Sequence, residues 1–243
     1  MFSIFKSKPK KDSPSILIDI HSHLLPAIDD GAKTMEEAWQ IIRTFEDLGY
    51  VKLNTTPHIM NDFYRNTPLG IQTKKDQLTN FLKEKYCSIQ IEAAAEYYLD
   101  ESLLQSVENN EALMTFGNQK YLLFETNFLT EPYPLKDFIF KITTKGYKPV
   151  LAHPERYEYL HKTFDKLEDL RNRGVLFQLN LLSLIGFYSI PIQRMAESMI
   201  DKGWVDFIGS DCHNTQYSVL IEKAQRTKYF KKALDLPLLN NSL

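Results

Sequence analysis

Five of the six histidines in the sequence stand just after short apolar or β-branched runs, and acidic residues take the same place after other runs. Neutral imidazoles and carboxylates are ligands that suit Zn, Mn or Fe in proteins. In His21-Ser22-His23, the alternation of side chains along an extended segment directs both rings to the same side. The candidate ligands are His21, His23, His58, His153, His213, Glu96, Glu125, Asp211 and one of Asp29 or Asp30.

These nine candidate ligands are too many for one ion, because a catalytic zinc takes about three protein ligands. We therefore expect two or three divalent metal ions, with a carboxylate shared between neighbouring ions. Metals about 3.5–4 Å apart are typical of phosphoester hydrolysis, in which they stabilise the attacking and leaving oxygens. So many carboxylates would also repel one another strongly if no cations lay between them.

Each candidate also has an ordinary explanation when it is taken alone. A His-x-His pair is often incidental, Glu96 and Glu125 could be solvated, and Asp29-Asp30-Gly31 is a common turn sequence. Their joint occurrence after six of seven runs favours a metal site. His161 stands apart from this pattern, and we expect it at the surface.

Seven strand-like runs alternate with segments of helical periodicity. The runs are 16–20, 51–55, 89–95, 121–124, 149–152, 175–179 and 205–209. Thr34 and Glu37 form a capping box, and apolar residues recur at helical spacing over 34–48. Similar patterns predict helices at 71–85, 135–145, 164–173, 192–202 and 217–234. Strands that are separated by helices predict parallel pairing through crossover connections.

The placement of the polar residues favours a closed or nearly closed barrel over an open sheet. In an α/β barrel the carboxyl ends of all strands converge on one face, and that face carries the active site. An open sheet would spread the same groups along a wide edge. Only the sixth run, which ends near Asn180, lacks a strong metal ligand. We expect a single α/β domain over 16–243, preceded by a flexible basic tail over 1–15.

Composition excludes several other classes of protein. Lys and Arg total 29 against 31 Asp and Glu, and a net charge of −2 removes the electrostatic case for a dedicated nucleic-acid binder. Two cysteines cannot form a disulfide framework, so a cytoplasmic location is expected. No apolar run approaches the roughly 20 residues that span a bilayer, so no transmembrane segment is expected.

The motifs around the candidate ligands resemble those of the PHP (polymerase and histidinol phosphatase) superfamily. The opening motif is Asp19-Ile20-His21-Ser22-His23-Leu24-Leu25-Pro26 followed by Ile28-Asp29-Asp30-Gly31. More narrowly, the chain resembles the bacterial PHP-type protein-tyrosine phosphatases of capsule and exopolysaccharide operons (CpsB/CapC type). Later motifs match in order from Ile16 to the final helix, at 56–58, 95–98, 124–125, 152–157 and 210–214.

The resemblance implies a distorted seven-stranded (β/α)7 TIM-like barrel that holds a trinuclear centre, often manganese, although iron and zinc suit the same ligands. One metal would take His21, His23, Glu96 and Asp211, a second Glu96, Glu125 and His153, and a third Asp30, His58 and His213. Of the adjacent pair, Asp30 matches the ligand position and Asp29 the supporting one. Arg156 matches an arginine that binds the substrate phosphate, and its planar guanidinium can hold two phosphoryl oxygens.

The chain departs from the family pattern after the Asp-x-His-Asn motif. A second arginine usually follows this motif, but 214–218 contains none, and Arg226 is too far along the helix. This departure puts the second phosphate contact in doubt. Cys212 replaces the commoner Ala or Met, and we expect it to be a small buried filler.

The resemblance implies hydrolysis of phosphotyrosine in proteins, with a bacterial tyrosine autokinase of polysaccharide synthesis or export as the substrate. We expect a metal-bridging hydroxide to attack phosphorus in line while the metals and Arg156 neutralise the equatorial oxygens. A cysteine mechanism is disfavoured, because the Cys-x5-Arg spacing would need Arg where Ala93 and Ser218 stand. Tyr97-Tyr98, Phe128 and Tyr133 either wall an aromatic substrate pocket or pack the barrel.

Other functions remain as alternatives at this point. One is a small-molecule phosphoesterase such as a histidinol-phosphate phosphatase, and another is a non-catalytic scaffold with a structural metal site. A PHP nuclease module is a third, which the charge balance disfavours. The oligomeric state stays open, and a homo-oligomer is one alternative.

Overall fold

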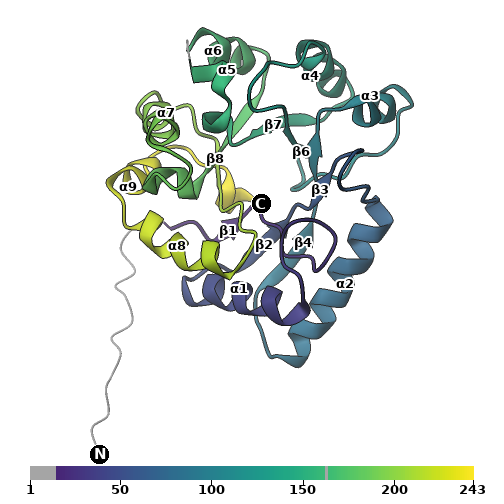
Figure 1. The fold of residues 1–243 in the computed structure, drawn as a ribbon, viewed down its shortest axis with the longest axis vertical. Coiled ribbons are helices and arrows are strands. Elements are labelled where there is room, and N and C mark those ends of the chain that lie inside the picture. The colour runs from purple at the N-terminus through teal and green to yellow at the C-terminus, as the bar shows by residue number, and fades with distance from the viewer. Residues whose placement is uncertain (1–14, 162–163) are drawn as a thin grey trace, which may run out of the picture.

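The computed structural model describes residues 15–161 and 164–243, so the tail predicted over 1–15 lies, except for Ser15, outside the described residues. Parallel strands and helices alternate along this part of the chain. The strands gather around the centre of the molecule, and the helices lie around them on the outside (Figure 1). The predicted α/β class and the parallel pairing are therefore confirmed.

The strands pair in parallel in two sheets. In spatial order, the first sheet contains β1 (Ile18–Asp19), β2 (Lys52–Thr55) and β4 (Gln90–Ala93). The second contains β3 (His58–Ile59), β5 (Glu96–Tyr98), β6 (Tyr121–Glu125), β7 (Lys148–Ala152), β8 (Leu176–Asn180) and β9 (Phe207–Gly209). Because all pairs are parallel, the carboxyl ends of the strands in each sheet point the same way.

The described residues form nine short strands, so the predicted count of seven is not confirmed. Only Thr56 and Pro57 separate β2 from β3, and only two alanines separate β4 from β5. Proline has no N–H to donate to a sheet ladder, which accounts for the first interruption. The run predicted over 89–95 therefore contains the whole of β4 and the gap that follows it, whereas β3 and β5 lie outside all the predicted runs.

The helices lie where the periodicity predicts them, with three differences, the first of which is that the prediction lacks the short helix at Glu158–His161. Their bounds are α1 (Met35–Asp47), α2 (Pro68–Glu84), α3 (Glu101–Glu108), α4 (Leu135–Thr144), α5 (Glu158–His161), α6 (Asp165–Asn172), α7 (Ile190–Asp201), α8 (Thr215–Gln225) and α9 (Lys228–Ala233). The segment 217–234 contains two helices instead of one, because Thr227 caps a new helix by accepting a hydrogen bond from Phe230 N. The prediction missed α3, which Asp100 caps through Leu103 N.

Three short 3₁₀ turns complete the secondary structure of the described residues: η1 (Pro154–Arg156), η2 (Leu181–Ile185) and η3 (Asn240–Ser242). One residue separates η1 from the end of β7, and η2 follows β8 directly, so both turns lie where these strands end. None of the helices in the described ranges combines the length and the apolar character that crossing a bilayer requires.

The core divides according to the two faces of the strands. Leu123 and Val150, which lie opposite each other on β6 and β7, belong to a small cluster whose buried members come from strands and loops. Their neighbours Phe124 and Leu151 face the other way and join the larger cluster that the helices cover. Alternate side chains along each strand therefore pack either in the space enclosed by the strands or against the helices.

Hydrogen bonds connect the first strand region to the last. Asp211 N donates to His21 O at 2.8 Å, and His23 N donates to Cys212 O at 2.9 Å. The buried Asp19 carboxylate accepts hydrogen bonds from both N and Oγ of Ser210, each at 2.8 Å. These contacts place the motif at residues 21–23 beside the motif at residues 211–213.

Asn240 of η3 also connects the first strand, β1, to the last strand, β9. Its buried Nδ2 donates to Ile18 O at 3.0 Å and to Ile208 O at 2.8 Å, and its Oδ1 accepts from Ile208 N at 3.0 Å. One side chain therefore satisfies backbone groups of both β1 and β9.

We expect Asn240→Ala to lower the free energy of unfolding by about 2–4 kcal/mol, because buried backbone groups of β1 and β9 lose their partners. Urea denaturation followed by circular dichroism measures this loss. Asn241→Ala is the matched control: Asn241 is exposed and bonds only Leu17 N and Ser15 O. The control should cost less than about 1 kcal/mol. Equal losses in the two variants would contradict the assigned role of Asn240.

Candidate metal centre

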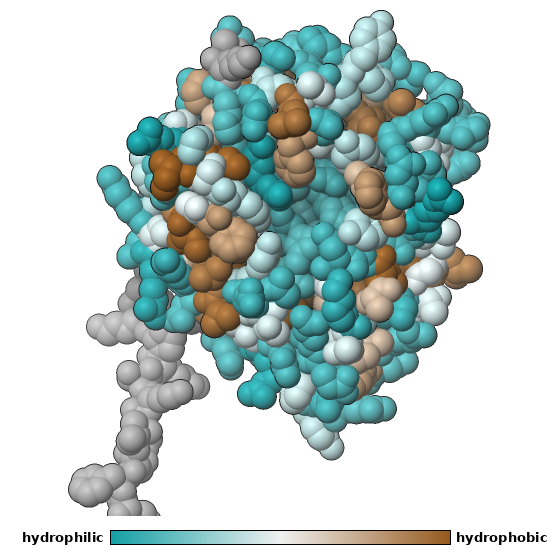
Figure 2. All heavy atoms as spheres, viewed as in Figure 1, coloured by the Kyte–Doolittle hydropathy of each residue, from teal (hydrophilic) through white to brown (hydrophobic). Residues whose placement is uncertain are grey.

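The face of the molecule at the strand ends is hollowed at its centre, and hydrophilic residues gather there (Figure 2). A cavity of about 380 Å³ opens in this region. Its lining contains four aromatic rings, one arginine and several of the candidate ligands: Asp30, His58, Met60, Tyr64, Glu125, Phe128, Arg156, Tyr188, Asp211, His213, Asn214 and Tyr217.

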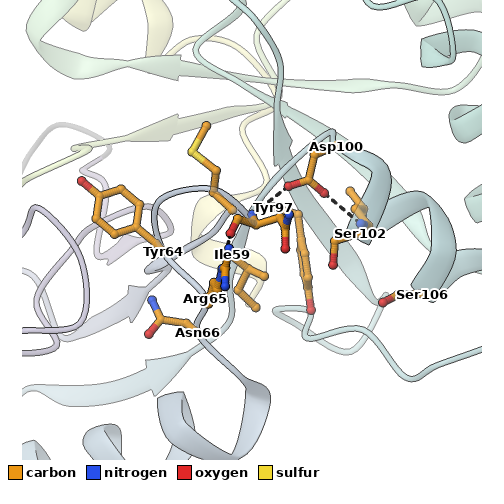
Figure 3. A pocket seen from close by; sticks show the side chains of 11 residues that line it. Ile59, Tyr64, Arg65, Asn66, Tyr97, Asp100, Ser102 and Ser106 are labelled. Carbon is orange, nitrogen blue, oxygen red and sulfur yellow. Dashed lines mark hydrogen bonds between the residues drawn. The ribbon is translucent and has the colours of Figure 1, made fainter.

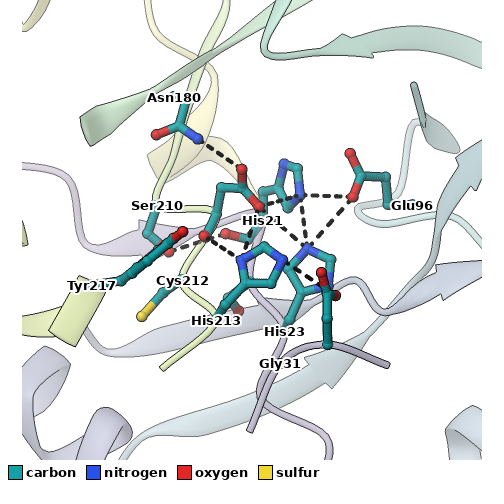
Figure 4. A network of polar contacts seen from close by, with 12 residues as sticks. His21, His23, Gly31, Glu96, Asn180, Ser210, Cys212, His213 and Tyr217 are labelled. Carbon is teal, nitrogen blue, oxygen red and sulfur yellow. Dashed lines mark hydrogen bonds and ion pairs between the residues drawn. The ribbon is translucent and has the colours of Figure 1, made fainter. Parts of the chain in front are cut away.

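Four buried side chains converge beneath the cavity (Figure 4). His21 Nε2 lies 3.2 Å from Glu96 Oε2 and 3.3 Å from Asp211 Oδ1. His23 Nε2 lies 3.5 Å from Glu96 Oε2 and 3.3 Å from Asp211 Oδ1. Two imidazole nitrogens and two carboxylate oxygens from three separate chain segments therefore surround one point.

The Glu96 carboxylate also reaches a second group of candidate ligands. Its Oε1 lies 3.0 Å from His153 Nε2, and its Oε2 lies 3.2 Å from His58 Nδ1. Glu125 faces the same two histidines, with distances of 3.2 Å to His58 Nδ1 and 3.9 Å to His153 Nε2. Glu96 therefore lies between two groups, as a carboxylate shared by two cations would.

A third group lies at the mouth of the cavity. Asp30 Oδ1 is 3.6 Å from His58 Nε2 and 3.5 Å from His213 Nε2. Asp29 lies behind this group, where its Oδ2 is 2.9 Å from His23 Nδ1 and its Oδ1 accepts a hydrogen bond from Gly31 N. Of the two neighbouring aspartates, Asp30 therefore faces the cavity, and Asp29 supports His23.

Three of the histidines have one ring nitrogen committed to a fixed partner, which leaves the other nitrogen for the cluster. His21 Nδ1 lies 2.7 Å from Gln178 Oε1, His23 Nδ1 lies 2.9 Å from Asp29 Oδ2, and His213 Nδ1 lies 2.8 Å from the carbonyl oxygen of Asp211. Each partner is an acceptor, so Nδ1 carries the proton and Nε2 presents a lone pair. This arrangement is typical of metal-binding histidines.

The electrostatics of the cluster also fit a cation. Burial lowers the pKa of His21, but the carboxylates of Glu96 and Asp211 outweigh this effect and raise it to about 9. Burial raises the pKa of Glu96 and of Asp211, yet the neighbouring histidines hold both well below their usual range. The buried carboxylates therefore require positive charge nearby. Divalent cations would supply it and leave the imidazoles neutral, as ligation requires.

His58 gives a second sign that the residues present fit a metal. Its buried Nδ1 has no hydrogen-bond partner, although Glu96 and Glu125 oxygens each lie 3.2 Å away. An unpaired nitrogen that faces two carboxylates can bind one cation together with them. Four groups of these side chains bring their ligand atoms within 4.8 Å of one another.

The backbone is constrained at two of the candidate ligands. His153 has φ 36° and Asp211 has φ 50°, a left-handed conformation that L-residues rarely adopt. Gly31 allows a close approach in the same region, because a Cβ at this position would lie 2.1 Å from His23 O. The loops at the strand ends are therefore shaped tightly around the site.

The strand β8 contributes two residues that the sequence prediction missed. Gln178 Oε1 accepts from His21 Nδ1 at 2.7 Å. Asn180 Nδ2 donates to Asp211 Oδ2 at 2.8 Å. The run without a strong metal ligand thus orients the ligands of other strands. The signal in the sequence was the spacing of two amides, which places both on one face of a strand.

Arg156 of η1 lines the cavity beside the cluster. Its Nη1 donates to Asp211 Oδ2 at 3.0 Å, and its guanidinium lies over the rings of Phe128 and Tyr188. Burial lowers the pKa of Arg156, but the Asp211 carboxylate and nearby groups raise it above its usual value. A permanent positive charge therefore faces the cavity.

Some of the other predicted residues lie elsewhere. Tyr97 is buried beside a second cavity of about 180 Å³, which shares Met60 and Tyr64 with the first (Figure 3). Tyr133 is fully exposed, so of the suggested aromatic wall only Phe128 lines the main cavity. His161 is half-buried rather than on the surface, and its Nε2 lies 2.6 Å from Glu155 O.

The segment that lacks the second arginine contributes Asn214 and Tyr217 to the cavity instead. Arg226, at the end of α8, is not among the lining residues and pairs with Glu222. Cys212 is fully buried, as the prediction of a small filler requires.

Comparison with known proteins places this geometry in a family. The model of the family described as capsular polysaccharide synthesis, CpsB/CapC, matches residues 17–233. The tyrosine-protein phosphatase YwqE of Bacillus subtilis is 28% identical to this chain, over 82% of the chain and 78% of its own length. The tyrosine-protein phosphatase CpsB of Streptococcus pneumoniae is 25% identical, over 90% and 89% respectively.

Solved structures agree with this assignment. One match belongs to the crystal structures of YwqE from B. subtilis and CpsB from S. pneumoniae, which are described as unique metal-dependent tyrosine phosphatases. It has a TM-score of 0.76 at 26% identity and covers 87% of this chain and 89% of the other. A probable 2-pyrone-4,6-dicarboxylic acid hydrolase from Acinetobacter baumannii, with a TM-score of 0.55 at 14% identity, shares the fold alone. This chain therefore belongs to the CpsB/CapC family.

Proposed function

We propose that this protein is a metal-dependent phosphatase that hydrolyses phosphotyrosine in proteins. The observation that carries the proposal is the meeting of acidic and imidazole side chains from six regions of the sheets beside a half-buried arginine, the one arginine among the described residues that line the cavity. Cations held there and the arginine would together bind a phosphoryl group. Relatives that span most of the chain are named tyrosine-protein phosphatases, and their structures are described as metal-dependent.

The proposed cofactor is two or three divalent metal ions, with manganese the first candidate and iron or zinc as alternatives. We assign the ligands as the family resemblance implies. The first metal takes His21, His23, Glu96 and Asp211, the second Glu96, Glu125 and His153, and the third Asp30, His58 and His213. His58 lies between the last two groups, because its Nδ1 also faces Glu96 and Glu125. Nitrogen and oxygen donors alone, without a thiolate, suit all three metals.

We also propose that β2 with β3, and β4 with β5, each form one interrupted strand of a distorted seven-stranded (β/α)7 barrel. The short gaps between these strands support this reading, because β3 pairs in parallel with β5 just as β2 pairs in parallel with β4. The hydrogen bonds between residues 21–23 and 211–212 support closure between the first and last strands.

The chain's own residues would perform the binding and orientation steps of the reaction. Bound divalent cations lower the pKa of water and neutralise charge on phosphoryl oxygens. The Arg156 guanidinium binds the equatorial oxygens of the phosphoryl group, which carry charge in the transition state. The rings of Tyr64, Phe128 and Tyr217 line the cavity where the phenyl group of the substrate would lie. A phenolate, whose conjugate acid has a pKa near 10, leaves more easily than an alkoxide.

The substrate that we propose is a phosphorylated bacterial tyrosine kinase of polysaccharide synthesis or export, because the family is described by capsular polysaccharide synthesis. We place the reaction in the cytoplasm, since both cysteines in the described part of the chain are free and a reducing compartment keeps them so.

Alanine substitutions should separate metal binding from phosphate binding. We expect His21→Ala and Glu96→Ala to lose bound metal and nearly all turnover of p-nitrophenyl phosphate. Arg156→Ala should keep its metal and lose about 10²–10³-fold in kcat/KM, as when one charge-stabilising donor is removed from an active site. Elemental analysis and steady-state kinetics measure both properties.

His161→Ala is the matched control, because this histidine belongs to none of the candidate ligand groups and, among the described residues, its ring hydrogen-bonds only the backbone oxygen of Glu155. It should keep both its metal and its turnover within about twofold of the wild type. Full turnover by a metal-free preparation would refute the proposed function.

Substrate comparison should distinguish a protein phosphatase from a small-molecule phosphoesterase. We expect kcat/KM for a phosphotyrosyl peptide to exceed that for histidinol phosphate by about tenfold or more, because aromatic contacts with the phenyl ring are worth about 1 kcal/mol. A phosphoseryl peptide of the same sequence is the control for the ring. A preference for histidinol phosphate would favour the small-molecule alternative.

Alkylation should leave the enzyme active. Burial raises the pKa of the Cys212 thiol well above its usual value, and a fully buried thiol is inert. Iodoacetamide treatment of the folded protein should therefore retain p-nitrophenyl phosphate turnover, with mass spectrometry reporting no modification of Cys212. A cysteine-dependent phosphatase treated in parallel should lose its activity. Loss of turnover together with modification of Cys212 would indicate thiol chemistry.

A further inference from the structure

Arg156 is the only lysine or arginine that the described residues contribute to the lining of the main cavity. Under the proposed function, the contribution of cationic side chains to phosphate binding therefore depends on one guanidinium. A long side chain loses conformational freedom when it binds a ligand, and this loss weakens binding unless the side chain is already fixed. The residues that fix the Arg156 side chain are therefore part of the binding site.

Two aromatic rings flank this guanidinium. Its Cζ lies 4.8 Å from the ring centroid of Phe128 and 4.3 Å from that of Tyr188. The two rings come from different parts of the fold, since Phe128 follows β6 and Tyr188 lies between η2 and α7. Arginine stacks on aromatic faces through its planar, weakly hydrated cation. Such contacts lie over the face of the group, whereas its N–H donors lie in its plane.

A hydrogen-bond circuit connects the same ring to the candidate ligands. Asn180 Nδ2 lies 2.8 Å from both Tyr188 Oη and Asp211 Oδ2. The same Asp211 oxygen accepts from Arg156 Nη1 at 3.0 Å. Arg156, Asp211, Asn180 and Tyr188 therefore form a closed set of contacts, and movement of any one of them disturbs the others.

The base of this circuit is itself buried and fixed. Glu155, which precedes the arginine in η1, is fully buried, and its Oε1 accepts from Asn180 N at 2.8 Å and from Ser183 Oγ at 2.7 Å. The backbone that carries Arg156 is therefore tied to the end of β8, which also carries Asn180.

We infer that Phe128 and Tyr188 are positioning residues that hold the Arg156 guanidinium ready for a phosphoryl group, and that Asn180 joins this arrangement to Asp211. With its Cζ over two aromatic rings and Nη1 on Asp211, the guanidinium keeps its remaining N–H donors for a ligand. Two such donors can hold two phosphoryl oxygens at once. The inference rests on the proposed function, because it assigns Arg156 to phosphate.

The dissociation constant of inorganic phosphate, measured by calorimetry on the metal-loaded protein, tests this inference directly. Inorganic phosphate has no phenyl ring, so any effect of an aromatic residue on its binding acts through the phosphate site. We expect Tyr188→Leu and Phe128→Leu each to weaken phosphate binding about 5- to 20-fold with metal content unchanged. Tyr188→Phe, which keeps the ring, should stay within about threefold of the wild type.

A double-mutant cycle separates positioning from a general structural role. If Tyr188 acts through the arginine, Arg156→Ala combined with Tyr188→Leu should bind phosphate as weakly as Arg156→Ala alone, within about twofold. Phe187→Leu is the matched control, because Phe187 contacts the Tyr188 ring but does not line the cavity. This control should leave the dissociation constant unchanged.

The outcomes are distinct for the inference and for the proposed function. Additive losses in the double variant, or unchanged phosphate binding in both leucine variants, would overturn the positioning role even if the protein is an active phosphatase. Non-additive losses would support it even if phosphotyrosyl peptides are not hydrolysed. If Tyr188→Leu fails to fold by circular dichroism, Phe128→Leu and its double variant with Arg156→Ala decide the question.

Discussion

The structure depends on positive charge that compensates the buried carboxylates at its centre. Glu96 and Asp211 are carboxylates that lie almost entirely out of solvent, and isolated buried charges of this kind are strongly unfavourable. Histidines from other strand ends surround them, and fixed acceptors orient three of those histidines. The fold brings these groups together because the parallel strands end on one side. The same topology therefore buries the carboxylates and places the compensating histidines beside them.

The main parts of this arrangement could be predicted from the sequence because they follow short-range rules. Apolar runs separated by helical periodicity gave the strand positions, and the residue just after each run gave the candidate ligands. Local residue types also indicate the strand break at Pro57 and the helix cap at Thr227, although the prediction did not use them. Such features are readable because they depend on the chain a few residues away.

The supporting residues could not be predicted in the same way. Gln178 and Asn180 are ordinary strand residues until His21 and Asp211, far away in sequence, come within hydrogen-bond distance. Residue type alone does not distinguish the aspartates at 29 and 30; the family resemblance gave Asp30 as the ligand, and in the structure Asp29 contacts His23. The sequence left open whether Tyr97 and Tyr133 line a pocket or pack the barrel, because the faces of their segments depend on neighbours that periodicity does not identify. Roles that act through a third residue are properties of the assembled fold.

The junction between the two ends of the described chain has a consequence for biosynthesis. His21 and His23 are synthesised about 190 residues before Asp211, the separation that also divides Asp19 from Ser210. During this interval the two imidazoles lack the Asp211 carboxylate that completes their surroundings. Contacts between such distant segments form slowly, because a long loop must close first. The group formed by His21, His23, Glu96 and Asp211 can therefore be complete only after residue 211 has been synthesised and the long loop has closed.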